Sequence, residues 1–596
     1  MNLYCNKVLI VDLTNKNISQ KDLNFDWVEK YFGGKGLGFR YLFDEINPNI
    51  DPLSPENVMI FIVGPLAGTL VPTTSRLALI TKSPATGTIL DSYIGGSIGA
   101  ELKFAGFDAI IIRGKSKEPV NLIINNEHCE LRDASEFWGR GIFETNKKIK
   151  ETLRDETFKT LCIGPAGENL VKFSCIGSES YRHFGRGGCG AVMGSKKLKA
   201  IAIKGSKGVK VDNLGGLLKV MESTAYPDLF SNENLWVRDD GTPHVIDVTS
   251  EMGILPTYNF QKSDFKGAHK LNSESIKKLK KSDRACFSCP LACGNFTKAQ
   301  QAQVEGPEYE TLAMAGANCG IEELETVIRF NEICDSLGLD TISTGNIIAY
   351  AMEMTERKIY NFDVRFGDEK NYLSIPKEIA YLKESRGKQL SIGVRELSKL
   401  FGGKEFAMEV KGLEFPGYEP RGNFGMGLGY ATSDRGACHL RAWTVFSERP
   451  FDLEEVPKEV INFQNLNSIK WSMIYCDFWG SIESRIIAEI FSVAFGKIFS
   501  PEYMDKAGER IWNLGRIFNV KSGFSRKDDY LPHRTLSEVL SEGPAKGKVL
   551  SEKAFNTMIS DYYSLRGWDS NGIPTDKKLN ELGIKEDELT DGGREK

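Results

Sequence analysis

Three cysteines lie within eight residues of one another, at Cys286, Cys289 and Cys293. Thiolates bind soft metals and iron–sulfur clusters, and this x2 and x3 spacing lets one loop wrap three corners of a cubane. A fourth ligand then has to come from another part of the chain. Structural zinc usually takes paired Cys-x-x-Cys knuckles or added histidines, and the nearest histidine, His269, lies seventeen residues upstream. The spacing therefore favours an iron–sulfur cluster, with zinc or unliganded thiols as alternatives.

The length and charge of the chain exclude several classes of protein. At roughly 100–200 residues per domain, 596 residues suggest three or four domains. A net charge of −4 shows no basic excess that would point to nucleic acid. No apolar run approaches the ~18–20 residues that a membrane span needs, and the N-terminus lacks a basic segment followed by an apolar one. We therefore expect a cytoplasmic protein with no membrane span and no nucleic-acid partner.

The spacing of apolar residues changes along the chain. After about residue 208 they take a helical spacing, clearest in residues 321–337, 343–354 and 483–495. Before it, short apolar runs separated by turn residues read as strands; they begin at Lys7, Val58, Arg76, Asp108, Val120, Leu161 and Lys199. A turn-rich segment from Pro416 marks a second boundary. We predict an α+β multidomain protein with a β-rich domain over residues 1–208 and mainly helical domains over 209–416 and 417–596.

Two glycine-rich loops could each be mistaken for a dinucleotide site. Residues 185–190 contain a formal GxGxxG, but no clear strand precedes them, and a strand rather than a long helix is expected after them. Residues 33–38, GGKGLG, also miss the fingerprint. Each loop is either a tight turn or a place where backbone approaches a phosphate-bearing cofactor, helped by Arg182 and Arg186.

Eight stretches occur in a fixed order along the chain. They are GGKGLGFRYLFDEINP from Gly33, GPLAGTLVPTTSRLALITKSP from Gly64, GGSIGAELKFAGFDAIIIRGKS from Gly95, GRGGCGAVMGSKKLKAIAI from Gly185, CFSCPLAC from Cys286, EGPEYET from Glu305, DSLGLDT from Asp335 and ATSDRGACHLRA from Ala431. Their joint occurrence is far more specific than any one of them. Through them the chain resembles the aldehyde:ferredoxin oxidoreductase family over nearly its whole length.

The resemblance implies both a fold and a set of cofactors. A β-rich N-terminal platform of two sheets carries tungsten or molybdenum bound by the dithiolenes of two pyranopterins, with magnesium bridging the pterin phosphates. Two mainly helical domains cover it. The three clustered cysteines and a distant one, Cys476 by order and spacing, hold a [4Fe-4S] cluster beside one pterin. The sequence does not distinguish tungsten from molybdenum, because both bind dithiolenes with near-identical geometry.

The resemblance also implies which residues touch the pterins. Arg76 lies between cluster and pterin, and Arg441 contacts a pterin phosphate. The other expected cofactor-binding residues come from the glycine loops and the first of two DxxGL motifs: Gly95, Gly96, Arg182, His183, Gly185, Arg186, Gly187, Gly188, Asp335, Gly338, Leu339 and Asp340. The second motif reads Trp471-Ser-Met-Ile-Tyr-Cys476, which keeps the cysteine and loses the aspartate and glycine, so one pterin is held differently.

The residues of the first motif also have a purely local interpretation. Gly338 follows a helical pattern and is a natural helix stop, and Asp340 is a natural N-cap for the next helix. Capping alone would explain both positions in an unrelated protein. In the family, the carboxylates of Asp335 and Asp340 also accept hydrogen bonds from pterin N–H groups.

Glu310 and His439 match the family's residues near the metal. A carboxylate can activate water as a general base, and a histidine can polarise an aldehyde carbonyl by hydrogen-bonding its oxygen. In an alternative mechanism metal-bound oxygen attacks directly, and Glu310 only manages protons. Glu308 is a rival base two residues earlier, and His439 without the resemblance would be read as a buried structural histidine.

We therefore predict an aldehyde oxidoreductase that passes electrons to ferredoxin or an iron–sulfur partner. No nicotinamide fold is visible in the sequence, and no Glu-x-x-His motif of the kind that bridges some family dimers occurs, so a homodimer or hetero-oligomer would form in another way. A first alternative is a catalytic subunit acting on an acyl-CoA thioester or aromatic ring. A second is a non-catalytic iron–sulfur electron-transfer protein. Five aromatic residues are candidates for an apolar pocket or for core packing: Phe424, Trp443, Tyr475, Phe478 and Trp479.

Overall fold

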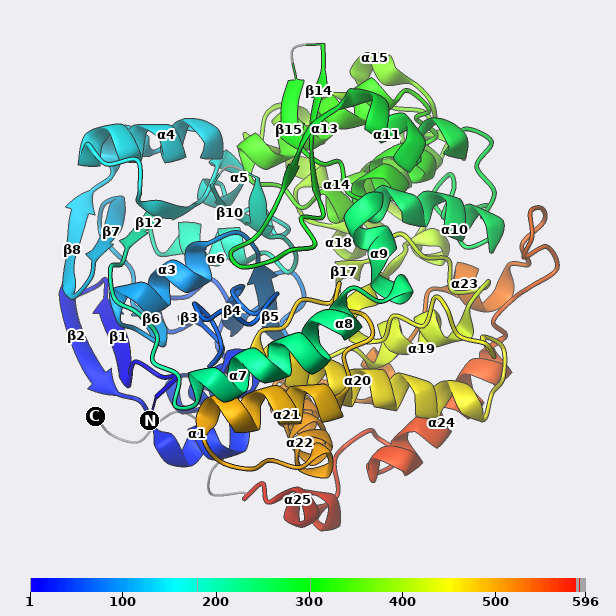
Figure 1. Cartoon of the computed structure of the whole chain (residues 1–596). Coiled ribbons are helices and arrows are strands. Elements are labelled where there is room, and N and C mark those ends of the chain that lie inside the picture. The colour runs from blue at the N-terminus through cyan, green and yellow to red at the C-terminus, as the bar shows by residue number, and fades with distance from the viewer. Residues whose placement is uncertain (1, 180, 301, 586–588, 590–596) are drawn as a thin grey trace.

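The computed structural model describes residues 2–179, 181–300, 302–585 and 589. Within these residues, the N-terminal part forms two six-stranded sheets (Figure 1). The first sheet contains, in spatial order, β2 (Asn17–Asp22), β1 (Lys7–Asp12), β6 (Ala109–Arg113), β3 (Met59–Ile62), β4 (Leu77–Lys82) and β5 (Ile89–Ile94). The second contains β11 (Arg182–Phe184), β10 (Ile176–Ser178), β9 (Lys159–Cys162), β12 (Leu198–Lys204), β7 (Val120–Asn125) and β8 (His128–Asp133).

The two sheets pack face to face because their strands alternate side chains between faces. Phe61 of β3 points into a core shared with the second sheet, where its ring centroid lies 5.9 Å from that of Phe184. Its neighbour Ile60 points to the opposite face, into a core with helices α2 (Gly34–Glu45) and α22 (Pro501–Lys521). The predicted two-sheet platform is confirmed.

The rest of the chain is mainly helical, as predicted. The three clearest helical patterns correspond to α13 (Leu324–Leu337), α14 (Thr341–Glu356) and α21 (Ser484–Phe495). Two small antiparallel sheets are exceptions among the described residues. Around the cysteines lie β13 (Lys280–Arg284), β14 (Gly294–Ala299) and β15 (Ala302–Glu305), and further on β16 (Glu409–Val410) pairs with β17 (Leu413–Glu414). The domain limits at residues 208 and 416 remain predictions.

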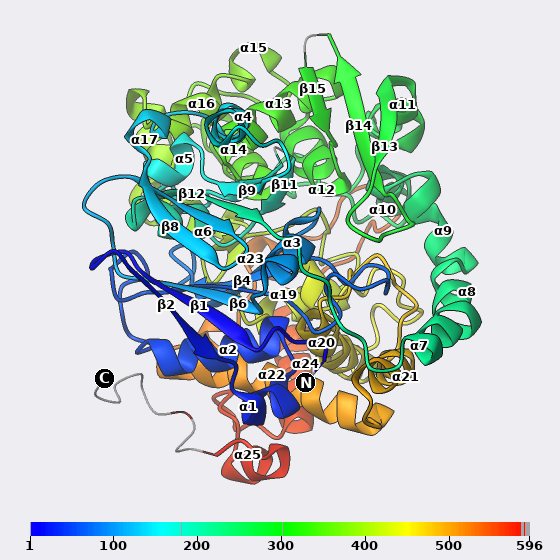
Figure 2. The same cartoon turned by 60° about the vertical axis from the view of Figure 1, so that its left-hand side comes forward.

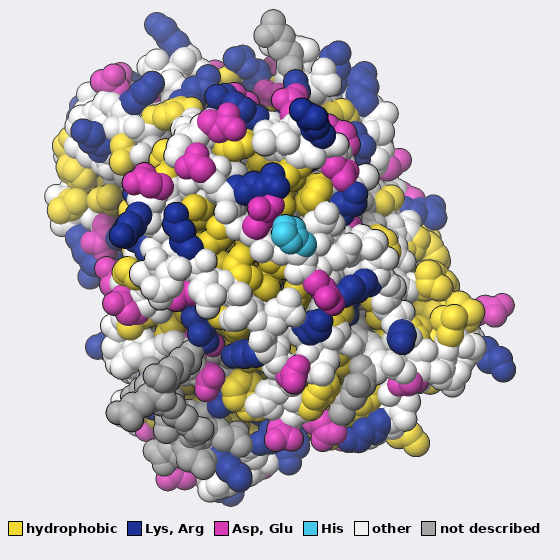
Figure 3. All heavy atoms as spheres, turned by 90° about the vertical axis from the view of Figure 1, so that its left-hand side faces the viewer, with side chains coloured by type: hydrophobic (Ala, Val, Ile, Leu, Met, Phe, Trp, Pro, Cys, Tyr) yellow, Lys and Arg dark blue, Asp and Glu magenta, His cyan; other side chains and the backbone are white. Residues whose placement is uncertain are grey.

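Helices from the C-terminal part cover one side of the platform. The helix α20 (Glu455–Met473) lies against both α2 and α22, so segments more than 400 residues apart in sequence pack together (Figure 2). On the face shown in Figure 3, positive and negative side chains are interspersed. No helix among the described residues combines the length and apolar character that a membrane crossing requires.

Candidate metal and cofactor site

The loop that carries the three clustered cysteines connects β13 to β14. The backbone N–H of Gly96 donates to Cys286 Sγ at 3.2 Å, which ties the loop to the first sheet. Cys476, three residues beyond the end of α20, joins the three: burial raises the pKa of Cys289 to about 11, and the nearby Cys476 and Cys286 add to that rise. Burial, Cys476 and Cys286 also raise the pKa of Cys293. The four thiols are therefore neighbours, and a soft cation would relieve the cost of ionising them.

No grouping typical of a single-ion site is seen among the described residues. No three His, Cys, Asp or Glu side chains within the described part of the chain converge closely enough to hold one metal ion, as a tetrahedral zinc site requires. Four coupled thiols on two separate segments are what a larger cluster needs.

Arg76 lies beside these thiols, and a place between the cluster and a pterin remains a prediction. Its Nη1 atom is 3.4 Å from Asp477 Oδ2, and Asp477 Oδ1 accepts a hydrogen bond of 2.8 Å from the indole of Trp471. Burial alone would lower the pKa of Arg76, but Cys476 and Asp477 together raise it above its ordinary value. Asp477 was not predicted, although its place directly after Cys476 could have suggested it.

The first DxxGL motif has the local structure that its sequence predicted. The helix α13 ends at Gly338, whose φ of 78° is left-handed, and Asp340 Oδ1 caps α14 by accepting from Ile342 N at 3.0 Å. Asp340 Oδ2 also lies 3.2 Å from Arg186 Nε. Leu339 pairs in an isolated bridge with Ser174, so the motif lies against the second sheet.

Asp335, the first residue of the motif, faces the N-terminal domain. Its Oδ1 atom is 3.7 Å from Nδ1 of His183, and its Oδ2 accepts from Asn331 at 3.0 Å. Burial lowers the pKa of His183 to about 4, so this imidazole is neutral. Arg182, the residue before it, pairs with Glu305 close to the cysteine loop.

The elements around residues 185–190 differ in part from the sequence prediction, which expected no clear strand before this loop. A three-residue strand, β11, does precede it, and a buried helix, α6 (Cys189–Ser195), separates it from β12. The pattern fails as a dinucleotide fold for another reason: β11 pairs antiparallel with β10, whereas the fingerprint needs parallel strands. A Cβ built on Gly185 would meet no atom within 4 Å, which leaves open space above the loop.

Glu310 and His439 meet although 129 residues separate them in sequence. Glu310 Oε1 is 3.2 Å from His439 Nδ1, and Glu310 Oε2 accepts from Gly417 N at 2.8 Å. Burial raises the pKa of Glu310 to about 8, and burial together with nearby arginines lowers that of His439 well below its ordinary value. At neutral pH the contact therefore joins two mostly neutral groups. The rival base Glu308 bonds to Thr242 instead.

Arg441 belongs to a buried charge network that the sequence did not reveal. Its Nε donates to Asp434 at 2.7 Å, and its Nη2 donates to Asp91. Lys35 pairs with the same two carboxylates. Only Nη1 of Arg441 has no partner and could reach a phosphate, so that role remains a prediction. Lys35 and Asp434 lie inside stretches that carry the family resemblance, which was the signal available.

Several buried polar atoms near these residues have no hydrogen-bond partner among the described residues. They are the donors Arg76 Nε, Arg435 Nε and Arg441 Nη1, and the ring nitrogen Nε2 of His183. Buried polar atoms are rarely left unpaired, so such a set indicates a polar ligand. Guanidinium donors suit an oxygen-rich, phosphate-bearing group, and the open space above Gly185 leaves room for one. The residues therefore fit a pterin cofactor beside a sulfur-bound cluster.

Comparisons with known proteins identify the family of the chain. A family model described as aldehyde ferredoxin oxidoreductase, N-terminal domain, matches residues 8–205, and one for domains 2 and 3 of the same family matches residues 222–584. A tungsten-containing aldehyde ferredoxin oxidoreductase of Pyrococcus abyssi is 40% identical over 98% of this chain and 99% of its own length. The aliphatic sulfonate oxidoreductase, WOR-like subunit, of Pyrococcus furiosus is 31% identical over 98% of both chains.

The fold also matches a solved structure. The active site complex BamBC of Benzoyl Coenzyme A reductase superimposes with a TM-score of 0.85, covering 98% of this chain and 97% of that one, at 24% identity. At that identity the match speaks for the fold alone. The two family models together span most of the chain, and the relatives align from end to end. The chain therefore belongs to the aldehyde ferredoxin oxidoreductase family.

Proposed function

We propose that this protein is a tungsten-dependent aldehyde oxidoreductase that forms carboxylic acids and passes electrons through a [4Fe-4S] cluster to ferredoxin or another iron–sulfur protein. Two groupings of side chains support the proposal. The thiols of Cys286, Cys289, Cys293 and Cys476 influence one another electrostatically, and Glu310 contacts His439. The names of the relatives support tungsten over molybdenum.

The reaction converts an aldehyde and water into an acid, two electrons and two protons. Bound tungsten–pterin and the cluster would supply the two-electron acceptor and the one-electron relay. Neutral His439 donates a ring N–H to the aldehyde oxygen and polarises the carbonyl. Glu310 takes a proton from the attacking water through Oε1, while Gly417 N holds Oε2 in place. A pKa of about 8 makes Glu310 a stronger base than an exposed glutamate once it is deprotonated.

The pH dependence tests this role. With a pKa of about 8, Glu310 is mostly protonated at pH 7, so kcat/KM should rise with pH and level off above pH 8. Glu310→Gln should keep its tungsten and iron yet lose most turnover. Glu308→Gln is the control and should keep both the profile and most of the rate. An active Glu310→Gln enzyme with the normal pH profile would refute the assignment.

Metal analysis tests the wider proposal. Anaerobically purified protein should contain tungsten and about four iron atoms per chain, and no stoichiometric zinc. Iron without tungsten or molybdenum would instead favour the electron-transfer alternative. Reduction of a ferredoxin by the enzyme and an aldehyde would identify the acceptor class.

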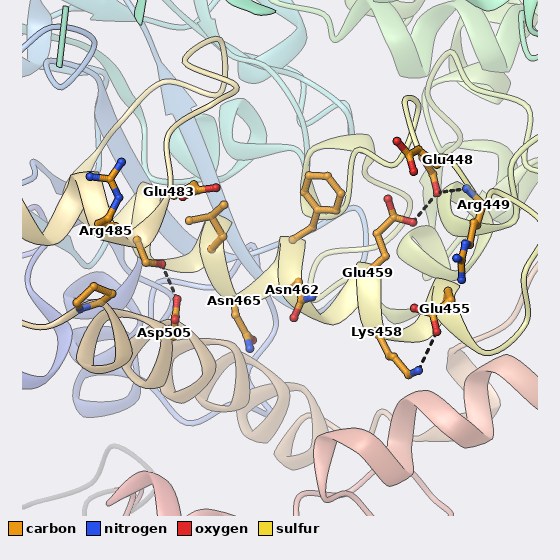
Figure 4. Close-up of a pocket in the computed structure, with 15 residues that line it drawn as sticks. Glu448, Arg449, Glu455, Lys458, Glu459, Asn462, Asn465, Glu483, Arg485 and Asp505 are labelled. Atoms are coloured by element: carbon orange, nitrogen blue, oxygen red, sulfur yellow. Dashed lines mark hydrogen bonds and ion pairs between the residues drawn. The ribbon is translucent and has the colours of Figure 1, made fainter. Parts of the chain in front are cut away.

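An acyl-CoA thioester is the second candidate substrate, because the solved structure of similar fold contains a dienoyl-CoA. The charge of one surface groove would count against it if the thioester entered there. A groove of about 1010 Å³ beside α20 is lined by more acidic than basic side chains (Figure 4). The acids are Glu448, Glu455, Glu459, Glu483 and Asp505, and the bases are Arg449, Lys458 and Arg485. An acidic excess repels the phosphates of coenzyme A. Thioester turnover faster than aldehyde turnover would reverse this ranking.

A further inference from the structure

A row of aromatic side chains starts beside His439. The ring of Tyr418 lies 5.6 Å from that of His439 and 6.4 Å from that of Trp443. Trp443 in turn lies 6.5 Å from Trp236 and 5.3 Å from Phe446. We call Tyr418, Trp443, Trp236 and Phe446 the aromatic row.

The aromatic row leads from the interior to the surface. Tyr418 is 3% exposed, Trp443 and Trp236 are half-buried, and Phe446 is 58% exposed. The row is therefore a continuous set of ring contacts between the Glu310–His439 pair and solvent.

The outer end of the row borders the surface groove. Ser447, which follows Phe446, lines the groove, and so does Leu466 of α20. The next residue, Asn467, donates to the carbonyl oxygen of Leu440 at 2.9 Å, beside His439.

The other aromatic residues that the sequence suggested for a pocket lie elsewhere. Tyr475 and Trp479 are fully buried in a core with α21, and Phe478 packs against that core. Phe424 is 8% exposed and its ring packs on Phe451. Of the five candidates, Trp443 alone belongs to the aromatic row.

We propose that the aromatic row binds the ring of an aryl aldehyde and makes aryl aldehydes the preferred substrate class. The inference rests on the proposed aldehyde oxidation at Glu310 and His439. A carbonyl held at His439 places its substituent against Tyr418 and Trp443. Flat ring faces and edges recognise another ring through stacking and edge contacts, beyond the burial that any apolar chain receives. A short aliphatic aldehyde can form neither stacking nor edge contacts with these rings.

Specificity constants of the holoenzyme test the proposal with benzaldehyde, hexanal and acetaldehyde. The wild-type enzyme should prefer benzaldehyde to hexanal, and hexanal to acetaldehyde. Trp443→Ala should lower the benzaldehyde-to-hexanal ratio by about tenfold, and Trp443→Phe should restore part of it. Trp138→Ala is a matched control, because Trp138 is half-buried next to the second sheet, far along the chain from the row, and its ratio should be unchanged. An unchanged ratio in Trp443→Ala would overturn the proposal, as would equal losses with all three aldehydes.

A binding measurement separates this proposal from the proposed function. Calorimetry with the product analogues benzoate and hexanoate needs no turnover. Tighter binding of benzoate, weakened selectively by Trp443→Ala, supports the aromatic row even if no aldehyde is oxidised, in which case only the proposed function fails. Oxidation of all three aldehydes with no preference for benzoate or benzaldehyde would sink the aromatic row and leave aldehyde oxidation standing.

Discussion

Two segments of the chain occupy equivalent places at the ends of long helices. Residues 335–340 begin in the last turn of α13 and residues 471–476 in the last turn of α20, and in both the fourth residue is left-handed and ends the helix. That residue is Gly338, with φ 78°, in the first segment and Ile474, with φ 66°, in the second. A β-branched residue rarely adopts this conformation, so the tertiary structure imposes the turn on the second segment.

Both segments press their backbone onto glycines of the platform. A Cβ at Gly164, just after β9, would overlap the carbonyl oxygen of Leu337 in the first segment. A Cβ at Gly34, the first residue of α2, would overlap the carbonyl oxygen of Trp471 in the second segment. Each segment therefore docks on the N-terminal domain by close backbone approach.

The polar groups of the two segments differ even though their backbones agree. The first segment supplies carboxylates at Asp335 and Asp340. The second has Trp471 and Cys476 in those places, and its nearest carboxylate is Asp477, which bonds to both Trp471 and Arg76. The difference teaches that docking on the platform preserves the turn, while the chemistry at each position is free to change.

Removing the thiol of Cys476 in the second segment should have the largest effect. Cys476→Ala should lower the iron content and abolish most activity, because one corner of the cluster loses its ligand. Iron analysis and the paramagnetic spectrum of the reduced protein measure this. Cys129→Ala, on the outer strand β8, is the control and should keep the full iron content. An unaltered spectrum in Cys476→Ala would remove Cys476 from the ligand set.

Adding a methyl group at Gly34 or Gly164 tests whether the two segments pack equally tightly against the N-terminal domain. Gly34→Ala and Gly164→Ala should each destabilise the protein by about 3 kcal/mol, because the overlapping atoms are backbone and cannot rotate away. Denaturant titration of the holoenzyme measures the free energy of unfolding. Gly215→Ala, where an added Cβ meets nothing, should change it little. A small effect at only one of the two sites would show that its segment docks loosely.

Two substitutions of Ile474 test whether its left-handed backbone is strained, because glycine should here be better tolerated than alanine. Ile474 is fully buried against α2 and the first sheet, so Ile474→Ala should cost about 4 kcal/mol of stability. Ile474→Gly removes the same side chain but also the backbone strain, and should be less destabilising than the alanine variant by about 1 kcal/mol. Gly338 also has a left-handed backbone, which favours glycine over alanine. Gly338→Ala should therefore lower the free energy of unfolding by roughly 1–2 kcal/mol. Denaturant titrations that found Ile474→Gly worse than Ile474→Ala would contradict the strain argument.

Replacing the carboxylate of Asp477 should have the smallest effect of these changes. It should alter the reduction potential of the cluster rather than the stability of the protein. Asp477→Asn removes a negative charge beside Cys476 and leaves Arg76 unbalanced, so the reduction potential of the cluster should rise by roughly tens of millivolts. Redox titration followed by electron paramagnetic resonance measures it. Asp228→Asn is a matched control, because Asp228 also accepts an indole N–H, from Trp479 at 2.6 Å. Equal shifts in both variants would show that Asp477 has no special influence.

Much of the platform could be predicted because its central strands are buried. Runs such as MIFI in β3 and AIIIR in β6 are apolar throughout, which marks a strand covered on both faces. The edge strand β2, NISQKD, was missed because it is mostly exposed and polar. The strand β13, KKSDR, was missed for the same reason. Edge strands hold their place through backbone hydrogen bonds, which leave little trace in side-chain pattern.

Some features of the candidate site could be predicted from nearby residues, and others could not. Capping by Gly338 and Asp340 was predictable because a helix end depends on residues close in sequence. The network of Lys35, Asp91, Asp434 and Arg441 was not, since its members come from three distant segments. Pairing across such distances depends on how the helices pack on the platform, which no local pattern contains.

By itself, the sequence determined the thiol spacing at Cys286–Cys293, the helix ends and the order of motifs, because each depends on neighbours a few residues away. Only the tertiary structure decided that Cys476 joins those thiols, that Ile474 accepts a left-handed turn, and that Glu310 meets His439 with a raised pKa. Burial and close backbone contact set these properties, and both arise only when distant segments share one interior.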